Sequence, residues 1–226
     1  RRLIGARLDR AALPVSFRRL SGYIVPGLSI GICSPLSGLV IRRTLAQQLD
    51  WASAGSATAI WRVSDWVLGC ASGALFFYFL PLLSPQIADG QWGVALRRLL
   101  RQVWLPSLAV LLLLFGLRDG LFSVFYDRRL TPDGGTIALF WLGDGLRILS
   151  AIGLVGLYAL RAGKTIALGA LLSQPLLALL LVLGAGQSLL WTGAAHAFSY
   201  AVYAAFNLGS LVVMQARRPR AHGPAA

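Results

Sequence analysis

The stretch FWLGDGLRILSAIGLVGLYALRAGK, residues Phe140–Lys164, is apolar for most of its length, yet Asp144 and Arg147 stand three residues apart near its beginning. A helix needs roughly 20 apolar residues to cross a bilayer, and this stretch is long enough. Charged side chains within a membrane helix usually face the interior of a bundle or a wet cavity, because lipid does not solvate them. The stretch therefore predicts both a membrane span and an internal polar site.

The composition of the whole chain indicates the same class of protein. Of its 226 residues, 57% are hydrophobic and 13% are charged, and the mean hydropathy is +0.69. Two long apolar runs, at 108–117 and 176–184, lack the alternation of a membrane β-barrel strand. A lipid-exposed backbone must then satisfy its own hydrogen bonds as a helix. We predict an all-α integral membrane protein, built as a six-transmembrane-helix bundle.

A basic linker at 1–19 precedes the predicted spans, and a basic tail at 216–226 follows them. The spans themselves are predicted at 20–41, 58–83, 103–122, 136–160, 165–184 and 190–215. An even number of spans puts both ends on one side, and most basic residues fall on that side. The opposite side has only Arg42, Arg43, Arg118, Arg128 and Arg129. The positive-inside rule then makes both termini cytoplasmic, with the basic segments against anionic phospholipid.

The second span repeats the charge pattern of the fourth, because Arg62 and Asp65 also stand three residues apart. This spacing places acid and base on one helical face, where they can pair and lessen the cost of leaving water. One interpretation is that all four charges reach the nearer headgroups. The other is that they line a cavity that holds an anion, since arginine matches phosphate oxygens well. Aromatic neighbours suited to an interface or to stacking on a sugar are Trp61, Trp66 and Trp141.

Other polar residues in the spans leave two interpretations open. His196 is the only histidine within a predicted span, and it serves either as a proton relay or as a hydrogen-bonded packing residue. Cys33 and Cys70 lack a metal-binding pattern and are interpreted as small core residues. Prolines in the spans act as hinges or reflect the ordinary composition of membrane helices; they are Pro26, Pro35, Pro106 and Pro175.

Several segments together resemble a known family. They are AIWRVSDWVLGCASGALFFYFLPLLSP (59–85), LFSVFYDRRLTP (121–132) and the stretch from 140 to 165 that contains Gly143, Asp144 and Arg147. Their order is similar to the carboxyl half of Wzx-type polysaccharide flippases of the O-antigen and lipid III kind, in the multidrug/oligosaccharidyl-lipid/polysaccharide exporter superfamily. The resemblance covers roughly 21–218. It implies one lobe of a twelve-helix, two-lobed transporter, so we expect the chain to be part of a longer protein.

The resemblance also implies a function. Such a protein is not an enzyme; it flips an undecaprenyl-diphosphate-linked oligosaccharide across the bacterial inner membrane by alternating access, with ion coupling and with polysaccharide assembly machinery as a further partner. We predict that Arg62 and Arg147, with Trp61, Trp66 and Trp141, bind this substrate. Asp65 and Asp144 are then predicted to couple ion movement, because a carboxylate released from its arginine in an apolar site takes up a proton more readily.

Functions of other classes are weaker matches. The sequence DGLR at 144–147 is similar to the opening of the CDP-alcohol phosphotransferase signature, but no Asp or Glu follows Arg147 to complete a metal site. Ser72 lacks the neighbours of a hydrolase nucleophile. The net charge of +13 does not indicate nucleic-acid binding, because the arginines cluster beside apolar runs. No cofactor or metal is predicted. An exporter of drugs or a lipid II flippase remains an open alternative, since the fold alone does not identify the cargo.

Overall fold

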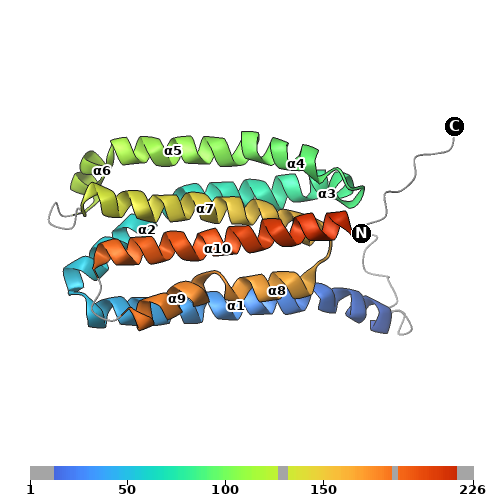
Figure 1. Cartoon of the computed structure of the whole chain (residues 1–226), viewed down its shortest axis with the longest axis horizontal. Helices are drawn as coiled ribbons and strands as arrows, with labels where there is room; N and C mark the ends of the chain where they lie inside the picture. Colours follow the sequence, from blue (N-terminus) through green and yellow to red (C-terminus); the bar gives the residue numbers. More distant parts are fainter. Residues whose placement is uncertain (1–12, 127–131, 185–187, 218–226) are drawn as a thin grey trace, which may run out of the picture.

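The structure is a computed structural model that describes residues 13–126, 132–184 and 188–217, and the described chain is helical without strands. Its helices lie roughly side by side in one bundle (Figure 1). In chain order they are α1 (Leu13–Gln48), α2 (Trp51–Gly73), η1 (Ala74–Phe79), α3 (Leu80–Ala88), α4 (Trp92–Leu99), η2 (Leu100–Trp104), α5 (Leu105–Gly116), α6 (Arg118–Phe125), α7 (Gly134–Ala159), α8 (Gly163–Leu171), α9 (Gln174–Leu183) and α10 (Leu189–Ala216).

Among the described residues, five helical segments are long and apolar enough to cross a membrane: Trp51–Ala88, Trp92–Gly116, Gly134–Ala159, Gly163–Leu183 and Leu189–Ala216. They correspond to the last five predicted spans, and they confirm a multi-pass, all-α membrane protein. The first predicted span falls within α1, which packs along α8 and α9 (Figure 1). Parts of the predicted linker (1–12) and tail (218–226) lie outside the described residues.

The helices extend beyond the predicted spans where apolar runs give way to amphipathic sequence. Helix α2 begins at Trp51, seven residues before the predicted span, and the carboxylate of Asp50 caps it by accepting a hydrogen bond from Ser53 N at 2.6 Å. The basic residues between the second and third predicted spans were expected in a loop, but they belong to helices. Arg97 and Arg98 lie in α4, and Arg101 lies in η2. An apolar-run criterion misses such turns, because only one side of α4 is buried.

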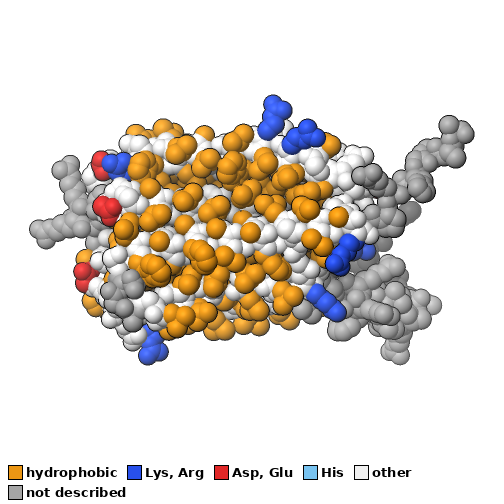
Figure 2. Space-filling model, viewed as in Figure 1, with side chains coloured by type: hydrophobic (Ala, Val, Ile, Leu, Met, Phe, Trp, Pro, Cys, Tyr) orange, Lys and Arg blue, Asp and Glu red, His pale blue; other side chains and the backbone are white. Residues whose placement is uncertain are grey.

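The surface of the bundle is divided by polarity along its length. Hydrophobic side chains cover the middle of the face seen in Figure 2, with most Lys and Arg towards one end, and with Asp and Glu at the other end beside some Lys or Arg side chains. The basic end holds the connections α3–α4 and α7–α8 and the end of α10, with Arg97, Arg98, Arg101, Arg161, Lys164 and Arg217. Described acidic residues at the opposite connections are Asp50, Asp119 and Asp133. An apolar band between polar ends is the form expected of a membrane-embedded bundle.

Helices α7 and α10 pack most closely, and glycine permits this approach. A Cβ atom added at Gly153 would lie 2.9 Å from Asn207 Cβ, and one at Gly156 would lie 2.5 Å from Leu211 Cδ2. Small residues at a helix contact let membrane helices approach without a hydrophobic driving force. Asn207 is fully buried at this contact and donates a side-chain hydrogen bond to Ser150 O at 3.2 Å. This helix pair forms the rigid centre on which the polar site is built.

Three helix irregularities precede prolines. The π-helical turns η1 and η2 end just before Pro81 and Pro106, and α8 is separated from α9 just before Pro175. A proline lacks the N–H that an α-helix uses at that position, so the preceding turn widens or breaks. Helix α1, by contrast, continues through Pro26 and Pro35. The break before Pro175 places Gln174 at the first turn of α9, inside the bundle.

Asp133 caps α7, and this cap gives a pH-dependent prediction. Its carboxylate accepts hydrogen bonds from the Thr136 hydroxyl and from Thr136 N, the latter at 3.0 Å, and these bonds lower the pKa of Asp133 below its usual 3.8. We expect Asp133→Ala to reduce the free energy of unfolding by about 1 kcal/mol at neutral pH. Because the pKa of Asp133 is lower in the folded state, its ionised carboxylate stabilises the folded protein fully above pH 3.8. This stabilisation is lost as the pH falls through the pKa of Asp133 in the folded state.

Unfolding of detergent-solubilised protein at pH 7 and at progressively lower pH measures this effect. The two proteins should differ at pH 7 and converge in acid. Asp89→Ala is the matched control, because Asp89 lies exposed at the carboxyl end of α3, where it caps no N-terminus. A difference that persists in acid would show that Asp133 stabilises α7 by means other than its charge.

Candidate functional site

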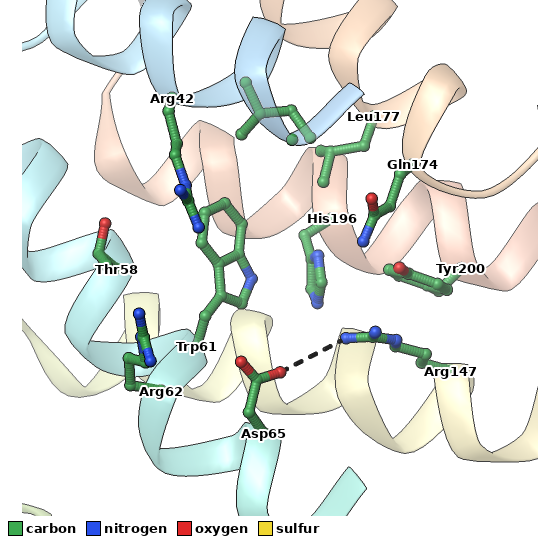
Figure 3. A pocket seen from close by; sticks show the side chains of 12 residues that line it. Arg42, Thr58, Trp61, Arg62, Asp65, Arg147, Gln174, Leu177, His196 and Tyr200 are labelled. Carbon is green, nitrogen blue, oxygen red and sulfur yellow. Dashed lines mark ion pairs between the residues drawn. The ribbon is translucent and has the colours of Figure 1, made fainter. Parts of the chain in front are cut away.

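A polar cavity of about 220 Å³ lies inside the apolar bundle, between α1, α2, α7, α9 and α10 (Figure 3). The side chains that line it are mostly charged, amide or aromatic. They come from Gly38, Ile41, Arg42, Thr58, Trp61, Arg62, Asp65, Arg147, Gln174, Leu177, His196 and Tyr200. Five helices therefore contribute to one site, with residues that lie far apart in the sequence.

Helical periodicity explains how each element presents its residues. On α2, Thr58, Trp61, Arg62 and Asp65 follow the i, i+3, i+4, i+7 pattern of one helical face. His196 and Tyr200 are four residues apart on α10, so they too share a face. Asp65 lies about four turns inside α2, counted from Trp51 at 3.6 residues per turn. Asp65 therefore lies well inside the helical segment Trp51–Ala88.

Arg147 lies at the centre of the polar contacts. Its Nη1 atom is 3.8 Å from Asp65 Oδ1 on α2, and its guanidinium carbon lies 5.5 Å from the centre of the Tyr200 ring on α10 (Figure 3). The Arg147 and Asp65 side chains are 35% and 53% exposed, so the pair borders open space. A charge-assisted hydrogen bond is normally about 2.7–2.9 Å long, and this contact is looser.

Asp144 has a different partner from the one its spacing suggests. His196 Nε2 lies 3.1 Å from Asp144 Oδ1, and the two side chains are 3% and 0% exposed. Residues three apart on a helix differ by about 60° in direction, so Asp144 faces α10 while Arg147 faces the cavity. The predicted pairing within each helix is therefore replaced by two contacts between helices, Arg147 with Asp65 and Asp144 with His196.

The His196 ring is held firmly. It stacks on Phe140 with ring centroids 5.7 Å apart, and it contacts Trp61 at 5.8 Å and Tyr200 at 4.9 Å. A Cβ atom at Gly143 would lie only 2.2 Å from His196 Cδ2, so glycine makes room for the imidazole. Asp144 Oδ2 and His196 Nδ1 are buried and have no hydrogen-bond partner among the described residues.

Two further hollows adjoin the cavity. One, of about 250 Å³, shares Arg147, Gln174 and Tyr200 with it. The other, of about 790 Å³, shares Arg42, Thr58 and Arg62. Arginine side chains therefore lie where the cavity meets each of the two hollows. In the described chain Arg42 and Arg62 have no acidic partner, so the cavity lining carries more positive than negative charge. Such a lining favours an anion.

The structure brings together four of the seven residues that the sequence analysis singled out: Trp61, Arg62, Asp65 and Arg147. Asp144 lies behind the cavity, against His196. The other two tryptophans lie elsewhere. Trp66 borders the hollow of about 790 Å³, where it is 66% exposed, while Trp141 packs on Phe115 of α5 with ring centroids 6.2 Å apart.

Sequence analysis did not place four other cavity residues in the site: Arg42, Gln174, His196 and Tyr200. His196 and Tyr200 carry a usable signal, since two polar residues four apart on an apolar span mark one polar face. The break before Pro175 is the corresponding signal for Gln174. Arg42 was assigned to a loop, but α1 extends to Gln48 and brings it into the bundle.

Comparisons with protein-family models, curated proteins and solved structures found no match to this chain. The chemistry of the site must therefore be inferred from its own residues. It combines three guanidinium groups, one carboxylate that contacts Arg147, an aromatic wall and a buried histidine–carboxylate pair.

Proposed function

We propose that the protein flips an undecaprenyl-diphosphate-linked oligosaccharide across the bacterial inner membrane by alternating access. The observation that supports this best is the arginine-lined cavity within an apolar bundle, joined to neighbouring hollows by shared residues. Moving a lipid-linked diphosphate requires positive charge in the membrane interior, where buried charges normally mark a substrate or ion path. The resemblance of the sequence to Wzx-type flippases gives the substrate class.

Arg147 and Arg62 are proposed to bind the diphosphate. The guanidinium group offers paired donors that match phosphate oxygens. Asp65 competes for Arg147, but their contact is 3.8 Å long and borders open space, so an arriving diphosphate can displace it. Trp61 provides an aromatic surface at the cavity, and Trp66 provides one in the adjoining hollow, where sugar rings can stack. Asp65 and Asp144 would then couple ion movement to this exchange.

The orientation of the protein is part of the proposal. More of the Lys and Arg side chains lie at the end where α1 begins and α10 ends than at the opposite end, as Figures 1 and 2 show. The positive-inside rule supports a cytoplasmic location for that end and contact of its basic residues with anionic phospholipid. The glycan would then pass from the basic end to the acidic end, towards the machinery that assembles polysaccharide.

Other candidate functions have less support. An exporter of another anionic lipid, such as a lipid II flippase, would use the same arginine chemistry, so cargo must be tested directly. A phosphotransferase of the CDP-alcohol kind would need clustered acidic ligands. Within 13–126, 132–184 and 188–217, no three His, Cys, Asp or Glu side chains come together. No observation favours that enzyme.

A reconstituted flipping assay tests the proposal. The protein is placed in proteoliposomes with a fluorescent short-chain polyprenyl-diphosphate disaccharide in both leaflets, and an impermeant reductant bleaches the outer leaflet. With active protein, the reductant is expected to bleach nearly all the probe; with empty liposomes, about half should remain. Parallel samples carry lipid II or a cationic dye. Equal transport of lipid II would overturn the assigned cargo, and no movement of any diphosphate lipid would overturn the proposed function.

A further inference from the structure

The buried contact between His196 and Asp144 is not explained by anion binding alone. Both side chains are almost completely shielded, and each retains one buried polar atom without a partner among the described residues. A buried polar group that is left unpaired destabilises a fold, so its retention suggests a role. His196 also lines the cavity that contains Arg147, which connects the pair to the anion site.

We propose that His196 is the proton-binding group of this site and that its protonation strengthens the binding of a diphosphate at Arg147. The anion half of this inference rests on the proposed function; the proton half rests on the His196–Asp144 contact. An unperturbed imidazole changes charge within the physiological pH range, which no other side chain facing the cavity does.

The hydrogen-bond geometry indicates where the proton goes. An ionised Asp144 can only accept, so the neutral imidazole donates from Nε2 across the 3.1 Å contact. This leaves Nδ1 as a bare acceptor without a partner in the described chain. A proton that reaches the ring therefore adds to Nδ1 and yields an imidazolium–carboxylate pair. The Nε2–Asp144 bond is kept and becomes charge-assisted, which offsets part of the cost of the new, buried Nδ1–H donor.

The surrounding charges determine the sign of the coupling. Arg147 lies on α7, one turn beyond Asp144. The other ionisable groups that line the cavity are Asp65 and Arg62 on α2, Arg42 on α1 and Tyr200 on α10. While His196 is neutral, the charge of Asp144 opposes an anion at Arg147. Protonation of His196 cancels that charge, and both His196 and Arg147 contact the same Tyr200 ring. An anion at Arg147 must, by reciprocity, favour protonation of His196.

Trp61 provides a direct measurement, because its ring contacts His196 and an imidazolium quenches indole fluorescence. The Trp61 signal is the difference between the emission of the wild-type protein and that of Trp61→Phe in detergent. We expect it to fall in one step as the pH decreases from 8.5 to 5. A symmetrical dimethyl diphosphate keeps both negative charges over this range. It should move the midpoint to higher pH by about one unit, which corresponds to tenfold coupling.

Three variants make the test decisive. His196→Gln should lose the step, whereas His222→Gln, which changes the other histidine of the chain, should retain it. Asp144→Asn should keep the step but move its midpoint to lower pH, because the imidazolium loses its counter-charge. A step that persists in His196→Gln, or no step in the folded wild-type protein, would overturn the proton site.

The two halves fail separately. A step that dimethyl diphosphate does not move would overturn the coupling to the anion while leaving His196 as a proton site. Absence of flipping of any diphosphate lipid in proteoliposomes, with an intact and diphosphate-sensitive step, would instead overturn the proposed function. The fluorescence readout does not depend on transport, so neither result obscures the other.

Discussion

We expect Arg147→Gln to abolish flipping and to weaken binding of a diphosphate diester by about 10- to 100-fold, the range given by loss of one or two hydrogen bonds to a charged group. Arg147 contacts Asp65 on α2 and Tyr200 on α10, and it lines both the cavity and the adjoining hollow of about 250 Å³. Arg42 and Arg62 lie where the cavity meets the other hollow, so they do not replace Arg147 there. Titration of dimethyl diphosphate against Trp61 fluorescence gives the affinity, and the proteoliposome assay gives the transport rate.

Two companion variants separate charge from geometry at this position. Arg147→Lys keeps the charge but loses the planar fork, so we expect intermediate affinity. Asp65→Asn removes the competing carboxylate and should raise affinity for the diester while leaving a polar side chain in place. Arg97→Gln is the control, because Arg97 is exposed on α4, where its Nε donates a hydrogen bond to Gly93 O at 3.3 Å. Normal affinity in Arg147→Gln would contradict the assignment of the anion to this cavity.

The general fold follows from the sequence because each apolar run has only one way to satisfy its backbone in lipid. The stretches around 108–117 and 176–184 therefore lie in α5 and α9 as expected. Helix ends were harder to predict. Helix α4 carries Arg97 and Arg98 on its exposed side, so hydropathy alone suggests a loop. The widened turns of η1 and η2 depend on prolines whose effect on a helix varies with tertiary context.

The site could be predicted only in part, because residue spacing determines faces and not partners. The face of α2 that carries Trp61, Arg62 and Asp65 follows from periodicity alone. That Asp65 meets Arg147, and that Asp144 meets His196, depends on how α2 and α10 pack on α7. Trp141 illustrates the same limit. It belongs to the apolar face of α7 that packs against α5, although it lies close in sequence to Asp144.

Packing also distinguishes the two glycines that flank Asp144 in the GDG sequence at 143–145. Gly145 lies against Leu108, and a Cβ atom there would be 3.8 Å from Leu108 Cδ1, an ordinary contact distance. Its carbonyl accepts a hydrogen bond from Trp104 Nε1 at 3.0 Å, which any residue could do. Gly143 faces α10 and has no such freedom. The two glycines are therefore unequal, although the sequence presents them alike.

We accordingly expect Gly143→Ala to reduce the free energy of unfolding by about 1–3 kcal/mol, as overpacking of a tight contact does. This is a larger loss than we expect for Asp133→Ala or Gly145→Ala. The new Cβ atom would lie 2.2 Å from His196 Cδ2, 3.0 Å from His196 Nε2 and 3.1 Å from Ala197 N. Rotation of the imidazole relieves only the first two contacts, so α10 must also move away from α7. The Asp144–His196 contact and the Trp61–His196 contact should both lengthen.

Unfolding in detergent measures the loss of stability, and the Trp61 titration measures displacement of the ring. We expect Gly143→Ala to lower Tm and to reduce the fluorescence step, because imidazolium quenching requires contact with the indole. Gly145→Ala, two residues away on the same helix, should leave both measurements close to wild type. Equal effects of the two substitutions would show that α7 tolerates no added side chain anywhere in this turn. Position 143 would then have no special role in holding His196 against Asp144.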